Sequence, residues 1–298
     1  MPELPEVESL RRGLAQNIIG QKIKKVWVGK PKLVSSHGNV RKASPEKVRE
    51  FIGNLTGETI KNLERQAKNL IIVFRSGKVL IVHLKMSGQL VYQPKSQKLK
   101  AVYGGHPIEV SEHKLPNKHT HITFELTRGT LYYNDTRMFG YILFYPDISA
   151  TGHHFLKYGM DPLSKGFIFE RFYEKLGKKK GRLKTILMNQ EIVTGLGNIY
   201  ADETSFLAGI SPLRNPQTLQ KREVKKLFEA IKKILPRAIE LGGSSVATYR
   251  LADGSRGNYA RELKVYGRGG LHCLHCGKNL KEIKLGGRTT VYCTNCQK

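Results

Sequence analysis

The sequence predicts an α+β protein, in which an N-terminal helix and an antiparallel β-sandwich precede a helical region and a C-terminal metal-binding segment. Three observations predict this class. Apolar residues recur at helical spacing near the N-terminus, strand-like runs separated by turn residues continue to about residue 146, and helical patterns dominate from residue 167 onward. All cysteines lie within the last 26 residues, which marks the C-terminus as a distinct small region.

The first predicted element is an amphipathic helix from Leu4 to about Ile18. Val7, Leu10 and Leu14 continue the apolar spacing between these residues, and Gly20 ends the pattern. Prolines in the first turn and carboxylates near a helix N-terminus are also ordinary structural features. The acidic, proline-containing start of the chain therefore has a structural explanation beside any catalytic one.

Strand-like runs follow this helix. Ser76-Gly77 and Arg128-Gly129 supply predicted hairpin turns. Because successive strands occur with one leading helix, we expect an antiparallel sandwich. The predicted strands are Ile23–Val28, Leu70–Phe74, Val79–Leu84, His121–Leu126, Leu131–Asn134 and Tyr141–Tyr145.

The second half has helical patterns, and Pro236 is expected to kink or split the last of them. A Gly/Ser-rich segment, residues 242–257, resembles a mobile loop. The predicted helices are Phe167–Leu176, Arg182–Gln190, Ile199–Ala208 and Gln217–Leu241. The predicted domains are a sandwich at 1–146, a linker at 147–165, a helical domain at 166–265 and a zinc-binding region at 266–298.

The charge balance indicates a polyanionic partner. The 298 residues contain 51 Lys+Arg against 24 Asp+Glu, a formal net charge of +27 spread along the chain. Nucleic acid fits this excess best, since neutralised phosphates release counterions, and a membrane surface is the weaker alternative. No apolar run approaches the roughly 20 residues that span a bilayer. We expect a soluble, cytoplasmic, nucleoid-associated monomer that needs no small-molecule cofactor.

The four cysteines predict a metal site. Cys273, Cys276, Cys293 and Cys296 have the spacing C-x2-C-x16-C-x2-C, which is typical of one tetrahedral Zn²⁺ held by four thiolates. His272 and His275 lie among them and are expected either beside the metal ligands, without binding the metal, or on the surface. A closed four-thiolate site has no open position for substrate, so the zinc is expected to be structural.

The extreme N-terminus is a candidate reactive site. Removal of Met1 would expose the secondary amine of Pro2 next to the carboxylate of Glu3. Amines that attack sugar or carbonyl carbons form Schiff bases, and such chemistry needs a nearby acid or base. Pro2 would supply the amine, and Glu3, its neighbour in the chain, would supply the acid or base.

Three separated motifs stand out along the chain. They are Pro2-Glu3-Leu4-Pro5-Glu6-Val7-Glu8, Gly195-Leu196-Gly197-Asn198-Ile199-Tyr200-Ala201-Asp202-Glu203, and the four-cysteine segment ending Cys296-Gln297-Lys298. In this order they closely resemble the formamidopyrimidine-DNA glycosylases. The resemblance implies a β-sandwich, a helical domain with a helix-two-turns-helix element that binds DNA, and a zinc-finger hairpin.

The resemblance also implies a bifunctional DNA glycosylase and abasic-site lyase acting on damaged double-stranded DNA. Such enzymes of base excision repair remove oxidised purines, 8-oxoguanine and formamidopyrimidines, through a Schiff base followed by β,δ-elimination. Pro2 would be the nucleophile and Glu3 the general acid/base. Lys68 would reach the damaged site, and Arg288 would bind the backbone and take part in elimination.

The same resemblance assigns DNA contacts. Met86, Arg137 and Phe139 would fill the space left by the everted nucleotide, since a base inside a duplex cannot be reached. Phosphate binding would fall to His119, Lys184 and Asn198, together with Arg288. Thr136 and Met138 depart from the commonest family pattern, which puts the fine detail of the opposite-base contact in doubt. The segment from Ser244 to Tyr259 would fold over the extruded base.

Two alternatives stay open. A sister group, the endonuclease VIII-like enzymes that remove oxidised pyrimidines, shares the amine chemistry and the finger. Leu4 and Glu6-Val7-Glu8 favour the purine branch. The second alternative is a non-catalytic zinc protein that binds nucleic acid, and the presence of Pro2, Glu3 and Lys68 together argues against it.

Overall fold

The structure is a computed structural model of the chain, and it describes residues 1–36, 44–96, 102–105, 115–244 and 257–298. The chain divides into two compact units, each made of three separate stretches of the sequence. Unit 1 contains Met1–Pro2, Glu6–Leu156 and Gly242–Gly257, and unit 2 contains Glu3–Pro5, Lys157–Leu241 and Asn258–Lys298. The first residues of the chain therefore belong to both units.

Two five-stranded sheets form the framework of unit 1. In one, the strand order is β1 (Ile23–Val28), β8 (Thr120–Leu126), β9 (Gly129–Asp135), β6 (Gly88–Pro94) and β7 (Val102–Gly105). In the other it is β2 (Val34–Ser35), β10 (Tyr141–Tyr145), β5 (Val79–His83), β4 (Asn69–Phe74) and β3 (Ile60–Gln66). Every pairing is antiparallel except the short pairing of β10 with β2. The predicted antiparallel architecture is confirmed in outline.

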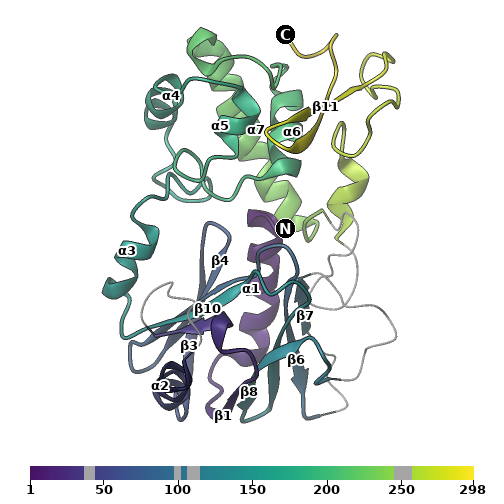
Figure 1. Cartoon of the computed structure of the whole chain (residues 1–298). Helices are drawn as coiled ribbons and strands as arrows, with labels where there is room; N and C mark the ends of the chain where they lie inside the picture. Colours follow the sequence, from purple (N-terminus) through teal and green to yellow (C-terminus); the bar gives the residue numbers. More distant parts are fainter. Residues whose placement is uncertain (37–43, 97–101, 106–114, 245–256) are drawn as a thin grey trace. The chain divides into compact units, whose positions relative to one another are not determined.

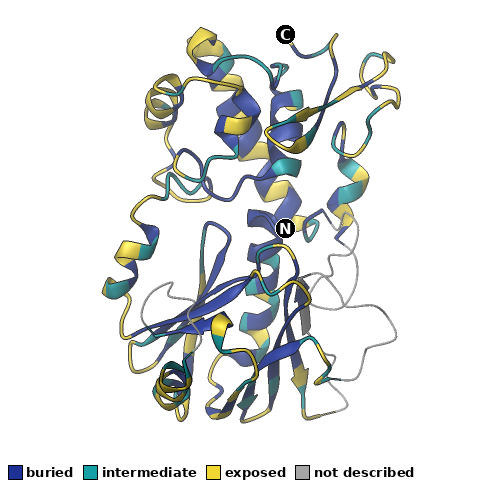
Figure 2. Cartoon of the chain, viewed as in Figure 1, coloured by how far each residue is buried: buried dark blue, intermediate teal, exposed yellow. Residues whose placement is uncertain are grey.

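The core of unit 1 joins both sheets to helix α1 (Leu4–Ile18). Val7, Leu10, Leu14 and Ile18 share one hydrophobic cluster with buried side chains of both sheets, and Figure 1 shows α1 running along them. Figure 2 shows much of these strands as buried. The helix ends before Gly20, whose φ of 80° lies in the left-handed region that favours glycine. The predicted helix is confirmed.

Unit 1 also contains elements that the sequence analysis missed. The expectation of a single leading helix is wrong, because α2 (Pro45–Leu55) packs Phe51 and Leu55 into the same cluster. Strands β2, β3, β6 and β7 were not predicted either. Near the end of its main segment, unit 1 also contains a 3-10 turn (Ser149–Thr151) and α3 (Gly152–Phe155), where only a linker was expected.

Unit 2 is built from helices and a C-terminal hairpin. The helices are α4 (Phe169–Gly177), α5 (Leu183–Leu187), α6 (Asn198–Leu207) and α7 (Lys221–Glu240), and the hairpin strands are β11 (Lys281–Leu285) and β12 (Arg288–Tyr292). Pro236 does not split α7, since the helix continues to Glu240 and buries Ala238 and Ile239 beyond the proline. Burial of this face offsets the lost backbone hydrogen bond.

No helix in the described part of the chain is long and apolar enough to cross a bilayer. Most of the predicted mobile loop at residues 242–257 lies outside the described residues, and so does most of the segment expected to cover the extruded base.

Candidate active site

Glu3 is held by the N-terminus of α6. Its carboxylate is 3% exposed and accepts hydrogen bonds from the backbone N–H groups of Gly197 at 2.7 Å, Ile199 at 2.9 Å and Tyr200 at 3.4 Å. The first N–H groups of a helix have no partner within the helix and carry partial positive charge. The fold therefore gives this buried carboxylate a fixed orientation and a favourable field.

Two glycines of the Gly-Leu-Gly-Asn segment permit this approach. A Cβ atom on Gly197 would lie 2.4 Å from Cδ of Glu3, and one on Gly195, where φ is +85°, would lie 2.5 Å from the Leu4 side chain. The N–H of Leu4 also donates to the Gly195 carbonyl at 3.0 Å. These glycines explain physically why the motif accompanies the N-terminal Pro-Glu-Leu.

Lys184 is buried in an ion pair. A lysine that binds phosphate directly would instead be exposed. Its side chain is 1% exposed, and Nζ lies 2.8 Å from Oδ1 of Asp202 and donates to the Thr289 carbonyl at 2.8 Å. Asp202 also accepts from the N–H of Val291 at 3.3 Å. Burial raises the pKa of Asp202 to about 7 and lowers the pKa of Lys184. The pair joins α5 and α6 to β12, a different arrangement from the predicted phosphate contact.

Arg288 is presented by this anchored strand. It is the first residue of β12, follows the Gly286-Gly287 turn and is exposed. The charges of Glu3 and Arg288 both act on Lys184 and change its pKa in opposite directions. Asn198, the first residue of α6, has a buried side-chain oxygen with no hydrogen-bond partner among the described residues. Unit 2 thus brings Glu3, Lys184, Asn198 and Arg288 together.

In unit 1, Pro2 and Lys68 are both buried. Lys68 lies in the turn between β3 and β4, next to Ala67 with φ of 56°, and is 6% exposed. Its charge acts on His83, whose pKa is held well below the usual value by burial and by Lys85 and Lys68. His83 therefore stays neutral, and its Nδ1 accepts from the N–H of Lys85 at 3.0 Å.

The three predicted wedge residues lie on two loops that share one buried carboxylate. Asp135, which is fully buried, accepts from the Ser87 hydroxyl at 2.5 Å and from the N–H groups of Arg137 at 3.2 Å and Gly140 at 2.8 Å. Met86 precedes Ser87 in its loop. The fold therefore brings the Met86 loop and the loop of Arg137 and Phe139 together on a common anchor.

The wedge side chains themselves are open to solvent. Met86 is 36% exposed and Phe139 is 47% exposed. The Arg137 guanidinium carbon lies 4.7 Å from the centre of the Phe139 ring, at the distance of a cation–π contact. His119 is half-buried, and its carbonyl accepts from the N–H of Asp135 at 3.0 Å. The four predicted DNA-contact residues of unit 1 thus lie on segments that hydrogen-bond with Asp135.

Three carboxylates with structural roles were missed or left general by the sequence analysis. Asp135 supports the wedge loops, and Asp202 pairs with Lys184. Glu6 accepts from the N–H and the hydroxyl of Ser244 at 2.8 and 3.1 Å, and so anchors the start of the segment expected to cover the base. Glu6 and Asp202 stand within the quoted motifs, but their partners are distant in sequence.

The four cysteines form one cluster at the C-terminus. Their Sγ atoms lie within 4.8 Å of one another, with 3.9 Å between Cys273 and Cys296 and 3.5 Å between Cys276 and Cys293. A tetrahedral Zn²⁺ with bonds of about 2.3 Å separates its sulfurs by roughly 3.8 Å. A hydrogen bond from the Lys278 backbone lowers the pKa of Cys276, which favours the thiolate that binds metal. The cluster fits one structural zinc.

The two histidines near these cysteines do not belong to the cluster. His272 and His275 are exposed, and the His272 ring hydrogen-bonds the Gly277 carbonyl. Glu203 instead supports the approach to the finger. Its buried carboxylate accepts from the N–H groups of Lys264, Val265 and Tyr266 at 2.9, 2.9 and 2.8 Å.

Comparison with protein families covers almost the whole chain. Residues 1–142 match the formamidopyrimidine-DNA glycosylase N-terminal domain, residues 158–250 match the formamidopyrimidine-DNA glycosylase H2TH domain, and residues 270–298 match the zinc finger found in FPG and IleRS.

Individual relatives extend this similarity. The formamidopyrimidine-DNA glycosylase of Desulfitobacterium hafniense is 36% identical over 94% of this chain and 93% of its own. That of Carboxydothermus hydrogenoformans is 38% identical over 93% of this chain and 92% of its own. A Lactococcus lactis FPG mutant bound to Fapy-dG containing DNA matches with a TM-score of 0.85 and 35% identity, covering all of both chains. The Lactococcus lactis Fpg bound to abasic-site DNA matches with a TM-score of 0.84 and 36% identity over 99% of both.

Proposed function

This chain belongs to the formamidopyrimidine-DNA glycosylase family, and we propose that it excises 8-oxoguanine and formamidopyrimidines from duplex DNA through the amine of Pro2. The observation that carries the proposal is the carboxylate of Glu3, next to Pro2 in the chain and bound by three backbone N–H groups of the α6 N-terminus. A MutM structure with carbocyclic 8-oxo-G containing DNA, 34% identical with a TM-score of 0.83, supports the purine assignment.

The proposed reaction requires a free N-terminal proline. Once Met1 is removed, the Pro2 nitrogen attacks C1′ of the damaged nucleotide, the new C–N bond replaces the bond to the base, and the departing base takes a proton from water. Opening of the sugar ring yields an iminium ion. An α-amino group has an ordinary pKa near 8, so a neutral fraction exists at pH 7.

Glu3 is the proposed general acid/base. Its carboxylate takes the proton that the Pro2 nitrogen loses on attack, gives this proton to the ring oxygen as the ring opens, and then accepts the 2′ proton that the iminium acidifies. Loss of the 2′ proton expels the 3′ phosphate, and a second elimination, with loss of the 4′ proton, expels the 5′ phosphate. Because backbone donors hold the carboxylate, its side chain loses little further conformational freedom when it acts.

The remaining predicted residues receive supporting roles. We propose that Lys68 contacts the damaged nucleotide and that Arg288 binds its backbone phosphate and assists elimination. Met86, Arg137 and Phe139 fill the space left in the duplex, and their exposure on anchored loops supports this role. His119 and Asn198 are the proposed phosphate contacts. For Lys184, the buried pair with Asp202 favours indirect action through β12 over direct contact with phosphate.

One zinc bound by the four cysteines supplies no reaction step in this proposal. It holds the finger so that β12 presents Arg288. Chelation, or Cys293→Ser, should therefore release about one zinc per chain and weaken duplex affinity, because folding of such a region is coupled to metal binding.

Borohydride trapping tests the function directly. The protein is incubated with a duplex that carries one 8-oxoguanine opposite cytosine, reduced with borohydride, and analysed by peptide mass. We expect a lesion-dependent covalent adduct on Pro2. An undamaged duplex is the control, and the intact mass must first establish that Met1 is absent. Duplex binding without an adduct, despite a free Pro2, would contradict the proposal.

The open alternatives are separated by substrate competition. A preference for 5-hydroxycytosine or thymine glycol over 8-oxoguanine would assign the protein to the pyrimidine branch. Binding without any excision of these lesions would assign it to the non-catalytic class.

We also propose a monomer that works in the cytoplasm in association with the nucleoid, which a net charge of +27 supports. The domain boundaries at 146, 165 and 265 stay a prediction. Limited proteolysis should cut preferentially near them.

A further inference from the structure

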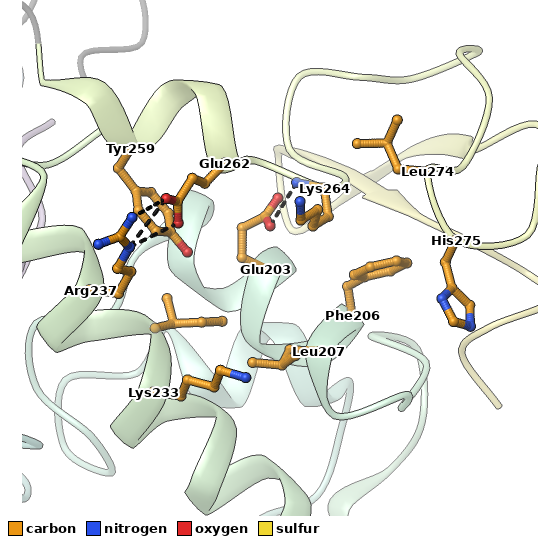
Figure 3. A pocket seen from close by; sticks show the side chains of 11 residues that line it. Glu203, Phe206, Leu207, Lys233, Arg237, Tyr259, Glu262, Lys264, Leu274 and His275 are labelled. Carbon is orange, nitrogen blue, oxygen red and sulfur yellow. Dashed lines mark hydrogen bonds and ion pairs between the residues drawn. The ribbon is translucent and has the colours of Figure 1, made fainter.

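A pocket in unit 2 has no role in the proposed reaction. Its volume is about 350 Å³, within the range of sites that accept small molecules or single side chains. Figure 3 shows that its walls come from α6, α7, the 3-10 helix Asn258–Glu262 and the cysteine-containing loop. Phe206, Leu207, Ile234 and Leu274 supply the apolar lining.

Two of these apolar residues remain open to solvent. Leu207 is 46% exposed and Leu274 is 64% exposed, while Ile234 is buried at 5%. Exposed apolar side chains grouped around a pocket, with charged groups at its edge, are typical of protein interaction sites. A partner's apolar side chain would cover both leucines and fill the pocket.

The edge of the pocket carries positive charge that is available to a partner. Its two carboxylates are already engaged, since Glu203 accepts three backbone N–H groups and Glu262 pairs with Arg237 at 2.6 Å. Lys233 and Lys264 are exposed and form no salt bridge with another described residue, although the charge of Lys264 acts on Glu203 and Glu262. The lining holds three cations, Lys233, Arg237 and Lys264, against these two carboxylates, so its net charge is positive. The available charge of the lining is therefore cationic.

We propose that this pocket is a docking site for an acidic peptide segment of a partner protein, with one apolar side chain inserted between Leu207 and Leu274. Its carboxylates contact Lys233 and Lys264. Apolar burial supplies affinity and the two ammonium groups supply orientation.

DNA is the competing occupant for a basic surface. Its backbone presents charged phosphates and sugars to a protein surface, and the lining formed by Phe206, Leu207, Ile234 and Leu274 offers those groups no hydrogen-bond partner. An acidic segment that contains an apolar residue matches both parts of the site, so the observations favour a peptide.

The test uses the full-length protein and a fluorescein-labelled octapeptide composed of Asp and Glu with one Leu and one Phe. Two control peptides replace either the acids by their amides or the apolar residues by serine. Fluorescence anisotropy is measured at physiological salt, where charges are screened beyond about 8 Å. The variants are Lys233→Glu and Leu207→Ala. The matched control is Lys232→Glu, which reverses an exposed charge on the same helix outside the pocket.

We expect the acidic apolar peptide to bind, with each pocket variant raising its Kd by about tenfold or more. Lys232→Glu should leave the Kd unchanged. The peptide without acids and the peptide without apolar residues should each bind more weakly, and the two losses measure the charge and the apolar contributions. Melting temperature and lesion incision should stay unchanged in Lys233→Glu. This variant therefore keeps the test valid even if Leu207→Ala fails to fold. Equal peptide affinity across all variants, or no binding to the unmodified protein, would overturn the proposal. Loss of undamaged-duplex affinity in the pocket variants would instead assign this face to DNA.

Discussion

The wedge loops of unit 1 and the charged cluster of unit 2 arrange polarity in opposite ways. The wedge loops expose Met86 and Phe139 to solvent and bury the carboxylate of Asp135 beneath them. The unit 2 cluster of Glu3, Lys184, Asn198 and Arg288 instead buries Glu3 at 3% and Lys184 at 1% exposure, and leaves Arg288 exposed. In both regions a buried polar group holds the segment that carries the exposed side chain: Asp135 holds the wedge loops, and the Lys184–Asp202 pair holds β12 with Arg288.

This difference shows how the fold separates two tasks. Side chains that must enter the space left by an everted base have to be exposed before DNA arrives, and a rigid polar base keeps their loops in place. A carboxylate that moves protons benefits from burial, because preorganised N–H groups replace water around it. The four predictions below test this separation.

Glu3→Gln should have the largest effect. It removes the proton-transfer group, so single-turnover excision of 8-oxoguanine should fall by roughly 10² to 10⁴-fold. Duplex affinity, measured by gel shift, should change little. The matched control is Glu6→Gln, one helical turn later and also 3% exposed, which contacts Ser244. A similar loss of excision in both variants would show that the role of Glu3 is only structural.

Asp202→Ala should destabilise the protein strongly. The replacement leaves the Lys184 ammonium buried without its counter-charge, and removing one member of a buried pair costs about 3–5 kcal/mol of unfolding free energy. Urea titration followed by circular dichroism measures this loss. The double variant Lys184→Met with Asp202→Leu should recover most of it. If the double variant is as unstable as the single one, the pair is not the origin of the effect.

Phe139→Ala should reduce catalysis without a comparable loss of stability. The side chain is 47% exposed, so the free energy of unfolding should change by less than about 0.5 kcal/mol. Excision should slow by about tenfold, because the unstacked duplex loses its filling group. Fluorescence of 2-aminopurine beside the lesion reports eversion. Ile148→Ala, at a residue 53% exposed in the same unit, is the control and should leave both quantities unchanged.

The pH dependence of stability gives the smallest effect. Burial holds the pKa of His83 well below the usual value, and the pKa values of His121 and His154 are lowered in the same direction, also by burial. The unfolded chain therefore gains protons that the native state cannot bind, so stability present above about pH 6.5 is lost as the pH falls. One such histidine contributes up to about 1.4 kcal/mol per pH unit.

His83→Asn should flatten this dependence below about pH 6.5 by up to one proton's contribution. Urea unfolding at several pH values measures the slope. An unchanged slope would mean that His83 becomes protonated in the folded protein, contrary to its burial.

Local patterns predicted much of the fold but few of its anchoring contacts. The apolar spacing of α1 and the turn at Ser76-Gly77 are properties of neighbouring residues, and both are confirmed. Helix α2 was missed although Val48, Phe51 and Leu55 have helical spacing. Strand β3 was missed because Lys61, Asn62 and Glu64 interrupt its apolar character.

The cysteines and the Pro2–Glu3 pair were found from the residues themselves and the DNA contacts by resemblance, but the surroundings of all of them depend on the folded chain. The bonds from Glu3 to Gly197 and from Glu6 to Ser244 join positions 194 and 238 residues apart. No local pattern specifies which of two nearby carboxylates binds which segment. The buried partner of Lys184 was likewise invisible, because Asp202 follows it by 18 residues within a motif noted for other reasons.

The short distance between Gly197 and Glu3 has a consequence for genetics. Any side chain at residue 197 would occupy the space of the carboxylate, since even a Cβ atom there lies 2.4 Å from Cδ of Glu3. In a random mutant library screened for repair, substitutions of Gly197 should abolish activity as substitutions of Glu3 do. Such a map would identify a residue that has no reactive group as essential, because it is the only one small enough to let the acid into place.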